Sequence, residues 1–113
     1  YQIVKDAHDK AIEAVRPGVK ASYVDSVARG FIKDAGYGKY FGHGTGHGVG
    51  LAVHEWPNIS PYNDDVLEEA MVFTIEPGIY IHGWGGVRIE DMVIVKKDGC
   101  EVLTEMPKEM VVL

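Results

Sequence analysis

The chain has 113 residues, which is the size of one small domain. Hydrophobic residues make up 46% of it, enough for a buried core and too many for a disordered segment. The net charge of -6 at pH 7 argues against nucleic acid as a partner. The single cysteine, Cys100, excludes an internal disulfide and favours a reducing, cytoplasmic setting, and the apolar runs are too short to span a membrane.

The first 15 residues predict a helix that ends at Arg16-Pro17-Gly18. Its apolar residues fall mostly on one helical stripe: Ile3, Val4, Ala7, Ala11, Ile12, Ala14 and Val15. Because the chain starts with Tyr1 inside this helix, we expect it to be a fragment of a longer protein. Residues 1–113 would then form a single partial domain.

A second helix is predicted over residues 22–35, where apolar residues recur three and four positions apart. Ser22 is the expected N-cap, with Asp25 three residues later in the position of a capping box. Gly36 is the expected C-terminal stop.

After Gly36 the pattern changes from helix to strand. Strands are predicted near Val53 and Ile59 and over residues 71–75, 78–81, 87–95 and 101–104, separated by turn residues. Two helices followed by a mostly antiparallel sheet make an α+β fold.

Carboxylates stand at unusual places in these strands. Glu76 comes where one strand ends, and Glu90 and Asp91 lie within a segment that is apolar enough to be a central strand. A buried carboxylate must be paired or bound to a cation. One interpretation is an Arg88–Glu90 ion pair, or a solvated edge. The other is that Glu76 and Glu90, from adjacent strands, share a cation site.

The segment 42–50 alternates glycine with other residues. If it is extended, its glycines lie on one face, open to close approach, while His43 and His47 lie on the other. A chain bend near Gly48 or Gly50 would return His54 to the same place. Zinc-finger, zincin and phosphate-loop patterns do not fit, which leaves a metal site of one histidine and several carboxylates, with the other histidines free for substrate contacts and proton transfer.

Three motifs, "GHGTGHGVGLAVHE", "TIEPGIY" and "VRIEDMVIV", together resemble the carboxy-terminal half of the catalytic domain of pita-bread metallopeptidases. The nearest branch is that of the Xaa-Pro aminopeptidases and Xaa-Pro dipeptidases (prolidases). The resemblance covers essentially the whole chain, helices included. It implies the C-terminal half of a pita-bread fold.

The resemblance also implies a metal centre. In this family two divalent metals are held by two aspartates, a histidine and two glutamates. His47 resembles the histidine ligand, Glu76 the first glutamate and Glu90 the second, which bridges both metals. Arg88 resembles the arginine before the bridging glutamate, where it orients that ligand. Manganese is the expected metal, with cobalt or zinc as alternatives.

Substrate contacts follow from the same motifs. His54 resembles the histidine that contacts the substrate carbonyl and steadies the tetrahedral intermediate, and His43 resembles one that lines the substrate pocket. Glu76 is the expected proton shuttle, so the expected catalytic residues are His54, Glu76 and His43. Many prolidases have an arginine directly after "HE-x-P"; this chain has Asn58, which favours substrates longer than dipeptides.

For the intact protein the resemblance implies hydrolysis of the bond between an N-terminal residue and proline. Its expected partners are peptides with proline at the second position, in a cytoplasmic homodimer that binds neither membrane nor nucleic acid. Neither Asp6 nor Asp9 matches the two aspartate ligands, so we expect the fragment alone to bind metal weakly or not at all and to be inactive. The alternatives are a non-enzymatic pita-bread module that binds peptides or proteins, and a purely structural domain.

Overall fold

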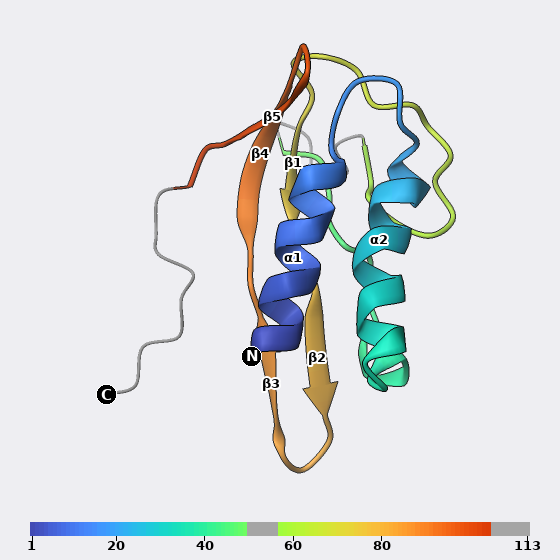
Figure 1. Cartoon of the computed structure of the whole chain (residues 1–113), viewed down its shortest axis with the longest axis vertical. Coiled ribbons are helices and arrows are strands. Elements are labelled where there is room, and N and C mark those ends of the chain that lie inside the picture. Colours follow the sequence, from blue (N-terminus) through green and yellow to red (C-terminus); the bar gives the residue numbers. More distant parts are fainter. Residues whose placement is uncertain (50–56, 105–113) are drawn as a thin grey trace.

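The structure is a computed structural model and describes residues 1–49 and 57–104. Two helices come first, followed by a short 3-10 helix and five strands (Figure 1). In chain order these are α1 (Gln2–Ala14), α2 (Ala21–Asp34), η1 (Gly38–Tyr40), β1 (Val72–Ile75), β2 (Gly78–Ile81), β3 (Gly85–Arg88), β4 (Asp91–Lys96) and β5 (Gly99–Val102). The predicted order of two helices and then antiparallel strands is confirmed.

Helix α1 buries one stripe of small and β-branched residues, as its spacing predicts, together with one histidine. The stripe is formed by Val4, Ala7, His8, Ala11 and Ala14. The helix ends before Pro17, and Gly18 then turns the chain with a φ of +93°, which a residue with a side chain rarely adopts.

Helix α2 starts one residue earlier than predicted, and its predicted capping box is wrong. The N-cap is Lys20, without a side-chain capping bond. The Ser22 hydroxyl instead donates a hydrogen bond to Asp64, at 2.7 Å. Asp25 is fully buried, because it faces the protein interior and bonds to residues far along the chain.

The strands form a three-stranded antiparallel sheet in the order β1-β4-β5 and a separate hairpin, β2–β3. The prediction of one continuous strand over residues 87–95 is wrong. The chain leaves the hairpin after Arg88 and joins the other sheet at Asp91, so Glu90 falls at the break between them. The central position predicted for the later part of this segment is confirmed, since β4 pairs with β1 on one side and β5 on the other.

Asp91 shows how a carboxylate is accommodated at the start of a central strand. It is buried, and its Oδ2 lies 2.9 Å from Nε2 of the buried His8 on α1. The Thr104 hydroxyl also donates a hydrogen bond to it. The expectation that a buried carboxylate here must be paired is therefore confirmed.

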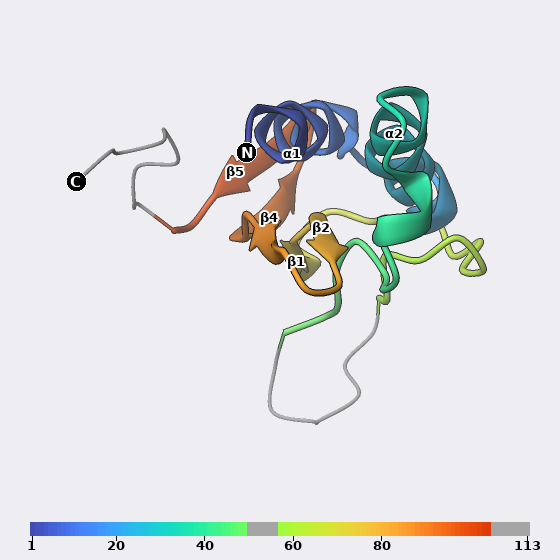
Figure 2. The same cartoon turned by 90° about the horizontal axis from the view of Figure 1, so that it is seen from below.

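The helices run antiparallel, side by side, and form one layer against the strands (Figures 1 and 2). The core lies between these layers, where Phe73, Ile75, Val93 and Val95 of the sheet are fully buried with the apolar stripes of both helices. Burying a side chain of this kind contributes about 1.5–3 kcal/mol. In the part of the chain that the structure describes, neither helix is long and apolar enough to cross a membrane.

Candidate metal and substrate site

The glycine–histidine segment lies along the outer edge of β1. Gly46 exchanges backbone hydrogen bonds with Ile59, at 3.1 and 2.9 Å. On its other side the Thr74 amide donates to the His47 carbonyl at 2.8 Å, and the Glu76 amide donates to the Thr45 carbonyl at 2.6 Å. In Figure 2 this green segment runs on the side of the sheet away from α1. The pairing fixes His47 beside the end of β1.

Gly46 shows why this segment is rich in glycine. A Cβ atom at this position would lie 1.7 Å from the backbone oxygen of Thr74, far inside the van der Waals limit. Only a glycine lets the segment lie this close to β1. At Gly46 the glycine face is therefore approached closely by the neighbouring strand β1 of the same chain.

His47 and Glu76 face each other. Nδ1 of His47 lies 3.0 Å from the Gly48 carbonyl oxygen, which can only accept, so Nδ1 carries a proton. The other ring nitrogen, Nε2, lies 3.3 Å from Oε1 of Glu76. A bare Nε2 lone pair would repel a carboxylate, so a proton or another cation between the two atoms stabilises the pair. This hydrogen-bonded orientation is typical of a metal-binding histidine.

The Thr74 hydroxyl links the same two residues. It accepts a hydrogen bond from the His47 amide at 3.0 Å and donates one to Glu76 at 3.3 Å. Thr74 is itself buried, so this link is shielded from water.

The two predicted glutamate ligands also meet. Burial raises the pKa of the Glu76 carboxyl, and a hydrogen bond with Glu90 and its negative charge raise it further. His47 and Arg88 act in the opposite direction and offset only part of this rise in pKa. Because each of the two carboxylates disfavours ionisation of the other, a cation bound between them would be electrostatically stabilised.

Arg88 lies near both glutamates. Its Nε is 3.8 Å from Oε1 of Glu90, and both side chains are about half exposed. The Arg88–Glu90 ion pair is therefore present, and it lies beside the close Glu76–Glu90 pair; a cation shared by the two glutamates stays a prediction. Such an exposed pair contributes little to stability, so Arg88 can leave Glu90 at small cost.

A cavity of about 550 Å³ opens onto these residues. Its lining includes His43, His47, Glu76, Arg88 and Asn58. His43 donates from Nδ1 to the Gly44 carbonyl at 2.6 Å, and its Nε2 lies 2.9 Å from the Tyr80 hydroxyl. The volume suits the end of a peptide rather than a single ion.

The donor set fits part of a metal centre. One imidazole nitrogen and two carboxylates suit Mn²⁺, Co²⁺ or Zn²⁺. Over residues 1–49 and 57–104, no group of three His, Cys, Asp or Glu side chains lies close enough to hold one ion. The described residues therefore do not form a complete metal site by themselves, and the ligand roles of His47, Glu76 and Glu90 stay a prediction.

One of the predicted site residues has no described position. His54 lies outside the described residues, so its substrate contact stays a prediction. Sequence reasoning missed Tyr80, although it lies four residues after Glu76 in the quoted "TIEPGIY" motif. It also missed the Asp25–Arg29 pair, whose spacing of four on a helix was the available signal.

Comparison with known proteins agrees with this geometry. The family described as "Metallopeptidase family M24" matches residues 1–97. The chain belongs to this metallopeptidase family. Membership implies divalent metal ions, which accords with the histidine and glutamates brought together beside β1.

The relatives support the narrower resemblance. An Xaa-Pro dipeptidase of Pyrococcus horikoshii is 53% identical over 111 residues, which is 98% of this chain and 32% of the relative. The solved prolidase from Pyrococcus furiosus has a TM-score of 0.94 at 55% identity, covering 96% of this chain and 32% of that one. The solved X-Pro aminopeptidase from Thermotoga maritima has a TM-score of 0.94 at 50% identity, and the match covers 99% of this chain and 32% of that one. The predicted family branch and pita-bread fold are confirmed.

The chain spans only about a third of the length of these relatives. The similarity therefore concerns one part of each relative, and it does not by itself transfer the activity of a whole protein to this chain.

Proposed function

We propose that the chain is the C-terminal part of a dinuclear metal-dependent peptidase that hydrolyses the bond between an N-terminal residue and proline. The observation that carries the proposal is that His47 and Glu76 face each other in one cavity, with Glu90 hydrogen-bonded to Glu76. Relatives named Xaa-Pro dipeptidase and X-Pro aminopeptidase over the same stretch support the substrate class.

In this proposal His47, Glu76 and Glu90 hold the metals, together with two aspartates that this chain does not contain. Manganese suits the mixed imidazole and carboxylate set best, with cobalt and zinc as alternatives. Lewis acidity toward the scissile carbonyl is the chemistry that bound divalent ions supply.

The remaining steps fall to side chains of this chain. Glu76, whose carboxyl pKa is raised by burial and by Glu90, takes a proton from the attacking water and passes it to the leaving nitrogen. His43, held by Tyr80 and the Gly44 carbonyl, lines the pocket for the substrate. His54 stabilises the developing oxyanion. Arg88 orients Glu90.

Substrate length depends on the cavity wall near Asn58. Asn58 lines the cavity and has no positive charge to bind a dipeptide's terminal carboxylate. We therefore propose that peptides longer than two residues are the better substrates. A cytoplasmic location and a homodimeric parent protein are further parts of the proposal, and the thiol Cys100 accords with a reducing compartment.

The test is an assay of the full-length protein, loaded with Mn²⁺, on an Xaa-Pro tripeptide and on the same peptide with alanine in place of proline. We expect hydrolysis of the first only, and loss of at least about a hundredfold in rate for His47→Ala. His82→Ala is the matched control, since His82 is exposed in the β2–β3 turn, outside the site. An inactive protein would favour the non-enzymatic binding module instead.

A further inference from the structure

An ion pair with a buried carboxylate lies directly behind the glycine–histidine segment. Asp25 on α2 is fully buried, and Arg29, one turn later, is 27% exposed. Nε and Nη2 of Arg29 donate to the two carboxylate oxygens of Asp25 at 2.8 and 3.0 Å. This two-bond geometry requires a guanidinium and cannot be reproduced by a lysine.

The pair also binds the backbone of the segment that carries His43. Nη1 of Arg29 donates to the Phe41 carbonyl at 3.0 Å, and Nη2 donates to the His43 carbonyl at 2.8 Å. The guanidinium carbon lies 4.3 Å from the centre of the Phe41 ring, on which the group packs. One side chain thus fixes both ends of a three-residue stretch.

Asp25 holds the next residue of the same segment. Its Oδ1 accepts hydrogen bonds from the Thr45 amide at 3.2 Å and from the Thr45 hydroxyl at 2.8 Å. The Thr45 carbonyl then accepts the Glu76 amide at 2.6 Å. A continuous series of hydrogen bonds therefore runs from α2, through Thr45, to the metal-ligand candidate at the end of β1.

From this series we infer that Arg29 and Asp25 are positioning residues for the site. Neither residue is itself part of the cavity lining. They hold the backbone at Phe41, His43 and Thr45, and so set the place of the His43 ring and of the Glu76 backbone. This inference rests on the proposed function only in treating His43 and Glu76 as site residues.

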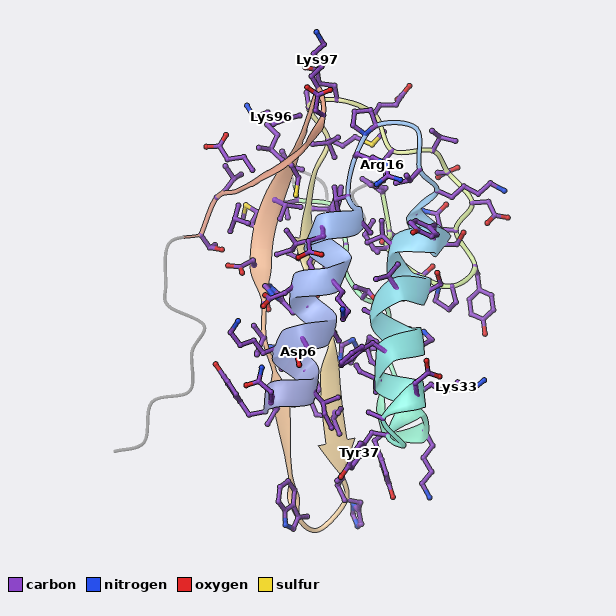
Figure 3. The ribbon with its side chains drawn as sticks, viewed as in Figure 1. Asp6, Arg16, Lys33, Tyr37, Lys96 and Lys97 are labelled. Carbon is purple, nitrogen blue, oxygen red and sulfur yellow. The ribbon has the colours of Figure 1, made fainter. Side chains whose placement is uncertain are left out.

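The chain offers a matched control for this role. Lys5 and Asp9 form an ion pair with the same spacing of four residues, at 2.8 Å, on α1. Neither residue of that pair lines the cavity described above. In Figure 3 their neighbour Asp6 lies on the outer face of α1, away from the strands. A change in this pair alters a helix ion pair without touching the glycine–histidine segment.

The experiment measures amide hydrogen exchange by NMR in the 113-residue chain, with Arg29→Lys compared with Lys5→Arg. We expect Arg29→Lys to lower protection at the amides of Thr45 and Glu76 by about tenfold or more, since a hydrogen bond to a charged group is lost. The Val95 amide, bonded to the Met71 carbonyl in the sheet, should keep its protection. The side-chain ¹⁵N signal of His43 should shift in the same variant.

Unchanged protection at Thr45 and Glu76 would overturn the inference, as would an equal loss at Val95 or in Lys5→Arg. If Arg29→Lys does not fold, Thr45→Val decides the question, because it removes only the hydroxyl bond to Asp25, and Thr45→Ser should restore protection. The measurement needs neither metal nor catalysis. A protein that proves inactive on Xaa-Pro peptides would therefore contradict the proposed function and leave this result standing.

Discussion

Two arginine–carboxylate pairs stand near the site, and they differ in almost every physical respect. In the Asp25–Arg29 pair the carboxylate is fully buried, the two side chains are joined by bonds of 2.8 and 3.0 Å, and both also bond to backbone groups. The Arg88–Glu90 pair is about half exposed and 3.8 Å apart. A buried, fully bonded pair is costly to break, whereas an exposed one contributes little. The first therefore suits a fixed support, and the second suits a group that can exchange its partner for a metal or a substrate.

The largest effect is expected when the buried pair is broken. Asp25→Ala leaves Arg29 without its main partner and removes two bonds to Thr45, so the free energy of unfolding should fall by about 3–5 kcal/mol. Urea unfolding at pH 7, followed by circular dichroism, measures this. Asp9→Ala, in the pair on α1 whose carboxylate is 44% exposed, should cost no more than about 1 kcal/mol. Equal losses of unfolding free energy in Asp25→Ala and Asp9→Ala would show that the Asp25–Arg29 pair supports the fold no more than an ordinary helix ion pair does.

The second largest effect concerns the segment that the buried pair holds. Gly46→Ala places a methyl group against the Thr74 carbonyl, and we expect it to destabilise the chain by about 3 kcal/mol. Gly42→Ala is the control, because a Cβ there meets nothing within 4 Å and the change should alter stability by less than about 1 kcal/mol. Similar unfolding midpoints for the two variants would contradict the close approach at Gly46.

A smaller change, an increase in stability, is expected when Glu76 in the cavity is replaced by glutamine. Because the pKa of Glu76 is raised in the folded state, the folded chain holds that proton more tightly than the unfolded chain does. Protonated Glu76 stabilises the folded chain in full at pH values below its pKa in the unfolded chain. This stabilisation is lost as the pH rises through the higher pKa of Glu76 in the folded chain. In the presence of a chelator, Glu76→Gln should therefore be more stable than the parent chain at pH 7 and no more stable in acid. Unfolding curves over this pH range measure the difference, and a Glu76→Gln variant that is less stable at pH 7 would reverse the sign.

The smallest effect on stability is expected for the exposed pair itself. Arg88→Ala should change the free energy of unfolding by less than about 1 kcal/mol, because both side chains are half solvated. The same urea titration serves as the measurement. A loss as large as that of Asp25→Ala would show that the two pairs have the same role.

Sequence reasoning selected residues that the structure brings together, but it missed the residues that support them. The glutamates, His43 and His47 stand in recognisable motifs, and a strand end or a glycine-rich segment is visible in the sequence. Asp25 was misassigned because a carboxylate near a helix start fits the capping pattern, whereas its true partners lie 4 and 20 residues away. The break at Glu90 was missed because apolar residues continue through residues 87–95, and only the exchange of sheets after Arg88 interrupts the ladder.

The most direct test of the account is a calorimetric titration of Mn²⁺ into the full-length protein and into its His47→Ala and His82→Ala variants. We expect two ions bound per chain in the parent protein and in His82→Ala, with lower stoichiometry or an affinity at least about tenfold weaker in His47→Ala. The isolated 113-residue chain should bind weakly or not at all. Unchanged binding in His47→Ala would contradict the assignment of this residue, and with it the metal site on which the proposed function depends.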